Sequence, residues 1–285
     1  MKKHLSTIIL ILVFCIGMSL VLYPSVANWW NTKVFNEDIA YYTEVVSAID
    51  TSEIDSLLAD AVEYNSRRAV TGNSFLPLKG EARNEYLMQL SVDENPMMGY
   101  LNIPKINSYL PIYHTTEEEV LSSGIGHIEG TSLPVGGEST HCVLSGHRGL
   151  PSARLLTDLD QLIIGDTFII EIFGLTLTYE VDQILTVLPE ELSALQIEEG
   201  KDYCTLVTCT PYGVNSHRML VRGHRTSNAN GELRVTADAL QIRPVMVAPF
   251  VAAPILLVLL VMMLVNTGYK KRISYPVEGD EEDEN

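Results

Sequence analysis

Two long, uncharged apolar stretches bracket the sequence and limit its fold more than any other feature. The first runs from Leu5 to about Leu22, and the second from Val245 to Val265. A helix rises about 1.5 Å per residue, so about 20 apolar residues cross a hydrocarbon layer of about 30 Å. Both stretches are therefore predicted to span a membrane, and the residues between them must form a folded domain.

Each stretch also has a second interpretation. Lys2 and Lys3 precede the first stretch and small residues follow it at 24–27, an arrangement that a cleaved signal peptide shares. Its apolar core exceeds the ~7–15 residues of an ordinary signal peptide, which favours a retained signal-anchor. The second stretch competes with a buried core helix, but its length and the basic cluster at 270–272 favour a stop-transfer span.

The basic residues also predict the orientation, because Lys and Arg that flank a span remain on the cytoplasmic side. Both termini are expected in the cytoplasm of a membrane-embedded protein, with the domain between the spans outside. The predicted organisation is a cytoplasmic N-terminus and signal-anchor (1–30), N-terminal helices with a loop (31–95), a β domain (96–225), a linker (226–244), a C-terminal transmembrane helix (245–266) and an acidic cytoplasmic tail (267–285).

Charge and cysteine content exclude several kinds of partner. The net charge is −17 and no basic stripe is present, which argues against nucleic acid. Cys15 lies in the first apolar stretch, and Cys142, Cys204 and Cys209 are scattered without a CxxC or zinc spacing. We expect no metal and no cofactor. Cys142 and Cys204 could form a disulfide across paired strands, although buried reduced thiols are favoured.

The pattern changes from helical to β-rich along the chain. Apolar residues from Val34 to Asn65 recur at three- and four-residue steps, interrupted at 50–52, which predicts two helices or one bent helix. From Met97 onward, short β-rich runs separated by turn residues predict a compact β domain that closes on itself. Helical insertions are expected at 116–121, where the capping-box spacing occurs, and at 153–162.

Two residues whose side chains could take part in catalysis are located where predicted strands end. Cys209 closes the apolar run 205–208, and His147 follows the run 142–146. Taken alone, each has an ordinary alternative, a buried apolar cysteine or an exposed loop histidine. However, Cys142 precedes His147 by the same interval that separates Cys204 from Cys209. If the two strands pair in parallel and in register, His147 and Cys209 emerge side by side.

Arg218 is the third candidate, on a strand that sends Arg218 and Arg222 to the same face. A guanidinium near a thiol can favour the thiolate or donate hydrogen bonds to an oxyanion. The alternative role for Arg218 is a surface ion pair in an acidic domain, and Arg222 is then the second choice.

These residues carry a resemblance to a known family. The stretch 205–225 reads TLVTCTPYGVNSHRMLVRGHR, and further matches lie upstream at 99–106 (GYLNIPKI), 110–114 (LPIYH), 126–137 (GHIEGTSLPVGG) and 145–152 (SGHRGLPS). Together they resemble the sortases, in particular the class C, pilus-assembling group. The resemblance covers roughly Pro96 to Arg225, and TLVTCTPYG is highly specific.

The resemblance implies a mostly β fold, an eight-stranded closed barrel with N-terminal helices and two flanking transmembrane helices. It implies a cysteine transpeptidase with Cys209 as nucleophile, His147 as general acid/base and Arg218 as stabiliser of substrate or oxyanion. The resemblance also implies that the enzyme is a monomer and that its partners are pilin or surface proteins with a C-terminal Leu-Pro-x-Thr-Gly-like signal. The enzyme would cleave this signal between Thr and Gly and join the new end to a lysine of another pilin subunit. Anchoring to the cell-wall peptide is the alternative, and a non-catalytic membrane-bound scaffold is a remote one.

One segment departs from the class C pattern. Class C enzymes carry a lid with an Asp-Pro-aromatic motif between the N-terminal helices and the barrel. The equivalent stretch here, 73–78, reads NSFLPL and has no Asp-Pro pair. Either Phe75, followed by Pro77, still covers the Cys209 pocket without the polar latch, or the stretch is an ordinary linker loop.

Overall fold

The computed structural model describes residues 2–92, 96–228, 256–258 and 260–262. The described residues from Ala27 to Asn228 belong to one compact unit, and those from Lys2 to Val26 belong to another. The first of these units contains the whole β domain.

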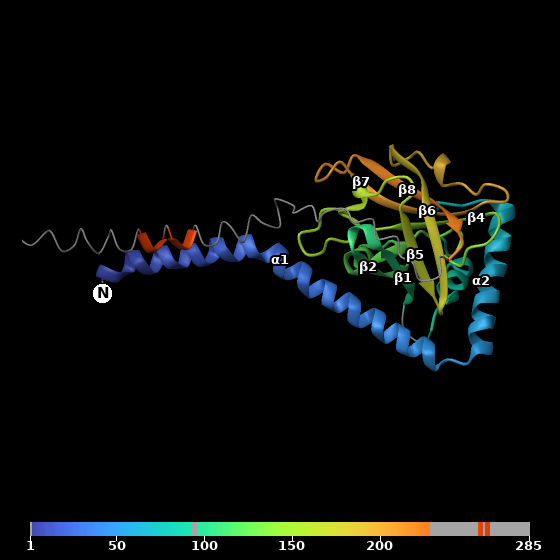
Figure 1. Ribbon diagram of the computed structural model, residues 1–285, viewed down its shortest axis with the longest axis horizontal. Coiled ribbons are helices and arrows are strands. Elements are labelled where there is room, and N and C mark those ends of the chain that lie inside the picture. The colour runs from blue at the N-terminus through green and yellow to red at the C-terminus, as the bar shows by residue number, and fades with distance from the viewer. Residues whose placement is uncertain (1, 93–95, 229–255, 259, 263–285) are drawn as a thin grey trace, which may run out of the picture. The chain divides into compact units, whose positions relative to one another are not determined.

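The β domain is a closed barrel with the strand order β1-β2-β3-β4-β7-β8-β6-β5 (Figure 1). The strands are β1 (Met97–Ile103), β2 (Ser108–His114), β3 (Ile125–His127), β4 (Thr140–Ser145), β5 (Thr167–Ile172), β6 (Leu175–Val187), β7 (Asp202–Thr210) and β8 (His217–Thr226). Buried and partly exposed residues alternate along β5, because successive side chains point to opposite faces of a strand. The predicted eight-stranded closed barrel is confirmed.

Three helices precede the barrel: α1 (Lys2–Ala48), α2 (Thr51–Thr71) and α3 (Glu81–Met88). The predicted break between the first two is present, and the side chain of Asp50 caps α2 by accepting a hydrogen bond from the Ser52 N–H at 2.8 Å. The later part of α1 packs on the barrel through residues at helical spacing, namely Phe35, Ile39, Tyr42 and Val46. The Tyr42 hydroxyl also donates to the Met98 carbonyl at 2.8 Å.

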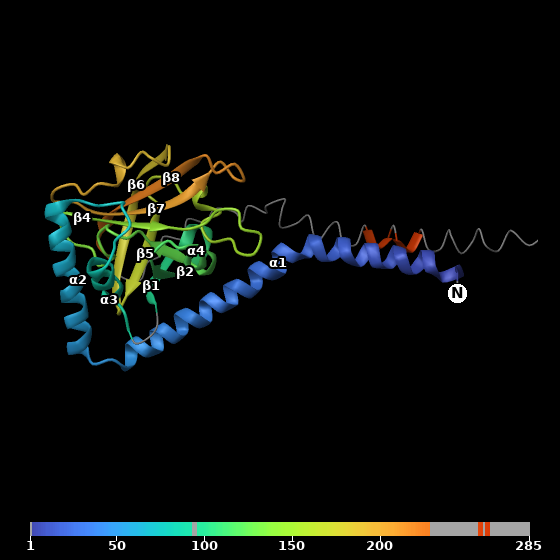
Figure 2. The ribbon, with the colours of Figure 1, turned by 180° about the vertical axis from the view of Figure 1, so that it is seen from behind.

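The two helical insertions have different outcomes. The first is α4 (Glu118–Ser123), which Figure 2 shows beside β2; it begins two residues later than predicted and has no side-chain cap. The predicted helix at 153–162 is wrong, because this segment contains only the short 3₁₀ helix η2 (Leu159–Gln161). Leu155 has φ +39°, a left-handed conformation that a helix cannot contain, and the Arg154 N–H donates to Asn28 Oδ1 instead.

Only the first predicted membrane span can be compared with the structure. Within the described residues, one helix is long and apolar enough to cross a membrane, from Ile8 to Ala48, and it includes most of the predicted span. The second span, at 245–266, falls mainly outside the described residues, where only 256–258 and 260–262 are placed as helix. The tail at 267–285 and nearly all of the linker at 226–244 also lie outside them.

Candidate active site

The pairing of β4 with β7 brings two of the predicted site residues together. The strands are parallel, with Cys142 opposite Cys204, so the register predicted from the equal spacing is confirmed. Past the end of β4, the Gly146 N–H donates to the Val207 carbonyl at 3.0 Å, and Thr208 Oγ1 donates to the Gly146 carbonyl at 2.8 Å. His147 and Cys209 therefore leave adjoining strands at the same end of the barrel.

The antiparallel pairing of β7 with β8 adds the third residue, because it places Arg218 directly opposite Cys209. Alternation puts the Cys209 side chain on the face of Val207, and the Arg218 side chain on the face of Leu220. These two apolar residues belong to one buried group, which we call the outer-face cluster: Val143, Leu195, Val207 and Leu220. Cys209 and Arg218 thus share the outer face of the barrel.

Arg218 is also better placed than Arg222 to meet a ligand. Its Nη1 donates to the carbonyls of Asn215 and His217, at 3.2 and 3.1 Å. No carboxylate among the described residues pairs with it, which leaves its other N–H groups available. Arg222 instead binds both carboxylate oxygens of Asp182, at 2.9 and 3.1 Å, so the second-choice cation is held in a structural ion pair.

Two further residues contact the site, and the sequence did not single them out. Arg148 donates from Nη1 to Thr210 Oγ1 at 3.2 Å and from Nη2 to Asp160 Oδ2 at 2.5 Å. It therefore joins the loop that carries His147 to the end of β7. The second residue is Glu118, whose Oε1 lies 3.3 Å from His147 Nε2. The contacts of Arg148 with Thr210 and of Glu118 with His147 join segments far apart in the sequence. The pattern of neighbouring residues therefore could not predict them.

The candidate lid segment at 73–78 lies on the same outer face. The Asn73 side-chain amide donates to the carbonyls of His141 and Leu195, at 2.9 and 2.8 Å. The next residue, Ser74, donates from its backbone N–H to the Gly130 carbonyl at 2.9 Å. Phe75 packs against the outer-face cluster, whereas Pro77 is exposed. The structure thus brings Phe75, and not Pro77, onto the apolar surface next to the Cys209 strand.

The other barrel cysteines differ from Cys209 in accessibility. Cys142 and Cys204 are buried inside the barrel as free thiols, whereas Cys209 is only half-buried. Burial raises the pKa of the Cys204 thiol well above its ordinary value. Neither interior thiol is exposed, so Cys209 carries the accessible thiol of the barrel.

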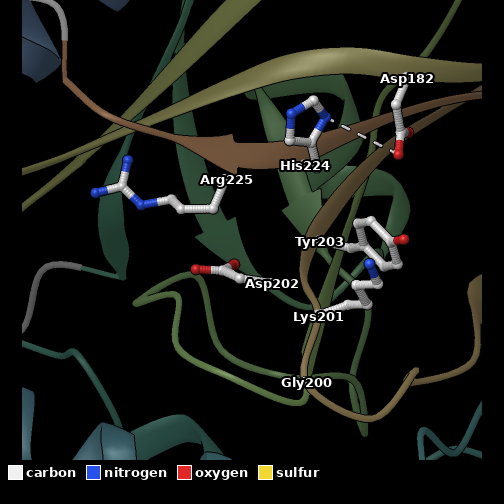
Figure 3. A pocket seen from close by; sticks show the side chains of 7 residues that line it. All are labelled: Asp182, Gly200, Lys201, Asp202, Tyr203, His224 and Arg225. Carbon is white, nitrogen blue, oxygen red and sulfur yellow. Dashed lines mark ion pairs between the residues drawn. The ribbon is translucent and has the colours of Figure 1, made fainter.

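A separate pocket of about 310 Å³ opens at the opposite end of β7 (Figure 3). It is lined by Asp182, Lys201, Asp202, Tyr203, His224 and Arg225. The Asp202 carboxylate already accepts hydrogen bonds from the Gly137 N–H and the Tyr179 hydroxyl, at 2.9 and 3.0 Å. This pocket contains none of the predicted site residues, and its carboxylates are engaged in holding loops and strands together.

Comparison with known proteins identifies the family of the barrel domain. The family model described as "Sortase domain" matches residues 101–226. The crystal structure of sortase C1 from Streptococcus agalactiae is 52% identical, with a TM-score of 0.66, and the match covers 67% of this chain and 98% of that one. Sortase C from Streptococcus pneumoniae is 41% identical, with a TM-score of 0.59, covering 67% and 97%. Sortase A from Bacillus anthracis is 24% identical over 222 residues, which are 78% of this chain and 95% of that protein.

Proposed function

Because this chain belongs to the sortase family, whose members are cysteine transpeptidases, we propose that it is a class C enzyme that polymerises pilins. The observation that carries the proposal is the strand register, which sets Arg218 opposite Cys209 and His147 at the adjoining strand end. The similarity to sortase C structures supports the class.

In the proposed first half-reaction, Cys209 cleaves a Leu-Pro-x-Thr-Gly-like signal between Thr and Gly. The thiolate sulfur forms a bond to the Thr carbonyl carbon, and the C–N bond to Gly breaks. His147 gives its proton to the leaving Gly amine, and the product is a thioester on Cys209. Arg218 donates hydrogen bonds to the carbonyl oxygen while it carries negative charge.

The second half-reaction transfers the acyl group to an amine. A lysine amine of another pilin subunit attacks the thioester, loses a proton to His147 and forms an isopeptide bond, which regenerates the Cys209 thiolate. The alternative acceptor is the amine of a cell-wall peptide, which would make the chain an anchoring enzyme. The remote alternative is a binding scaffold without catalysis.

We place the enzyme in the cell membrane as a monomer. The apolar part of α1 supports an N-terminal anchor. The basic residues Lys2 and Lys3 support a cytoplasmic N-terminus and an extracytoplasmic barrel. The second span and the cytoplasmic C-terminus are part of the same proposal and follow from the apolar stretch at 245–265 and its basic flank.

One assay separates these functions. The full chain in detergent is given a sorting-signal peptide together with either a pilin domain or a wall-peptide amine, and the products are identified by mass spectrometry. Polymerisation predicts transfer to the pilin lysine, and anchoring predicts transfer to the wall peptide. Cys209→Ala should abolish cleavage, and cleavage that survives this change would overturn the enzyme assignment.

The lid belongs to the same proposal. We expect Phe75 to restrict access to Cys209, because its ring packs on the outer-face cluster from the segment that Asn73 and Ser74 tie down. Exposed Pro77 is expected to shape the segment without contacting the thiol. Phe75→Ala should increase the rate at which a thiol reagent labels Cys209, and equal rates would make the segment an ordinary linker.

A further inference from the structure

We infer that Glu118 is a positioning residue for His147, whose carboxylate selects the imidazole tautomer that can exchange protons with Cys209 and the substrate. The inference rests on the proposed role of His147 and adds a fourth residue to the site. The observation is the 3.3 Å approach of Glu118 Oε1 to His147 Nε2.

The topology explains why the two residues meet. β3 runs antiparallel to β4, with Gly126 opposite Ser145, so the start of β3 lies beside the end of β4. α4 leads directly into β3, and His147 follows directly after β4. The helix that carries Glu118 is therefore fixed next to the loop that carries the histidine.

Several contacts hold α4 in this place although the Glu118 side chain is 80% exposed. Arg83 pairs with Glu117, the residue before Glu118, and its Nε donates to Glu129 Oε1 at 3.1 Å. The helix also packs closely on β3, because a Cβ atom at Gly126 would lie 3.1 Å from a methyl carbon of Leu121. The backbone under Glu118 is thus anchored on two sides.

The chemistry follows from the hydrogen-bonding capacity of the two groups. An ionised carboxylate only accepts, so a neutral imidazole bound to Glu118 must carry its proton on Nε2. The lone pair then lies on Nδ1, which is the nitrogen left to exchange a proton with the thiol or the substrate amine. When His147 carries both protons, the carboxylate stabilises the imidazolium. A third group that orients the base of a nucleophile–base pair is a general feature of such sites.

The two cations of the candidate site have hydrogen-bond partners other than the imidazole. The Arg148 guanidinium binds Thr210 and Asp160, and the Arg218 Nη1 donates to backbone carbonyls. In the part of the chain that the structure describes, Glu118 is the carboxylate paired with His147. Removing it therefore changes one interaction of the histidine.

The test compares Glu118→Ala, Glu118→Gln and Glu118→Asp with Glu119→Gln in the full chain. Glu119 is the matched control, since it is exposed on the same turn and bonds Ser122 through its backbone carbonyl. An exposed charge-assisted hydrogen bond predicts that Glu118→Ala lowers kcat about 3- to 10-fold with KM nearly unchanged. Glu118→Asp should recover part of this loss, and Glu119→Gln should match wild type.

A second readout does not depend on turnover. Nitrogen-15 NMR of the histidine rings should find His147 of the wild type protonated on Nε2 when neutral, and a mixture of tautomers in Glu118→Ala. If Glu118→Ala has the kcat and the ring spectrum of the wild type, the inference about Glu118 is overturned. Cleavage of the peptide by the same proteins would still support the proposed function. If wild type cleaves no sorting signal, the proposed function fails even where the tautomer responds to Glu118.

Discussion

Asn73 offers a direct way to open the candidate lid without touching Phe75. Its buried side-chain amide joins the start of the segment to two other parts of the outer face, the His141 carbonyl on β4 and the Leu195 carbonyl on the β6–β7 connection. Asn73→Ala removes both donors and leaves the apolar side chain of Phe75 unchanged. The expected result is a segment that leaves the outer face more often.

The structure sets the size of this effect. Each lost hydrogen bond contributes about 0.5–1.5 kcal/mol, and the carbonyls left without a donor raise the cost. Part of that cost is offset, because Asn73 Oδ1 is buried with no hydrogen-bond partner in the described part of the chain. A net change of about 2 kcal/mol would increase the open population roughly 30-fold, since about 1.4 kcal/mol corresponds to a factor of ten.

The assay is the rate at which a methanethiosulfonate reagent labels Cys209, followed by peptide mass spectrometry. Cys15 is exposed and should be replaced by Ser in every variant, whereas Cys142 and Cys204 are buried. Asn84→Ala is the matched control, because Asn84 is exposed on α3. Asn73→Ala should label about 10- to 30-fold faster than the control. A wild-type labelling rate, with a lower free energy of unfolding, would refute the gating role and leave Asn73 a purely structural residue.

Three further predictions concern the site and its support. Arg148→Ala should lower kcat/KM about tenfold or more, because the His147 loop loses its two bonds to Thr210 and Asp160; Arg148→Lys, with a single point charge, should recover only part. Tyr86→Phe should lower the free energy of unfolding by about 1–3 kcal/mol in urea titrations, since the buried hydroxyl accepts from the Thr115 N–H at 3.1 Å and contacts His127 Nδ1 at 3.0 Å. Burial lowers the pKa of His114 and His141 from 6.5, so below that pH the unfolded chain binds protons that the folded chain does not. The free energy of unfolding should therefore fall as pH drops from 7.5 to 5.5, by at most about 1.4 kcal/mol per pH unit for each histidine. His141→Gln should reduce this dependence of the unfolding free energy on pH.

The register of β4 and β7 could be predicted from the sequence because it follows from the spacing of residues within each strand. The intervals from Cys142 to His147 and from Cys204 to Cys209 are equal, and both follow apolar runs that form strands. The pairing of Arg218 with Cys209 could not be derived in the same way. It depends on the length of the turn between β7 and β8, which sets the antiparallel register.

Two features could not be predicted from the sequence, the strand β3 and the contact of Glu118 with His147, and they share a physical cause. β3 has three residues in a glycine-containing stretch and is too short for an alternating pattern to identify it. Its position depends on close backbone packing, because a Cβ atom at Gly126 would lie 2.2 Å from the Thr115 carbonyl oxygen. Without β3 the neighbourhood of α4 is undefined, and the contact of Glu118 with His147 cannot be foreseen.

The alternation of the barrel strands also explains how one chain buries two thiols and leaves a third accessible. Cys204 and Cys209 lie an odd number of positions apart on β7, and the ladders to β4 and β8 show no register shift between them. An odd interval on a strand reverses the face, so the same strand that buries Cys204 beside Cys142 must turn Cys209 outward, opposite Arg218. Insertion of one residue between them would make this interval even, and both cysteine side chains would then lie on the same face of β7. The spacing that first suggested a paired active site is thus also the spacing that makes its cysteine accessible.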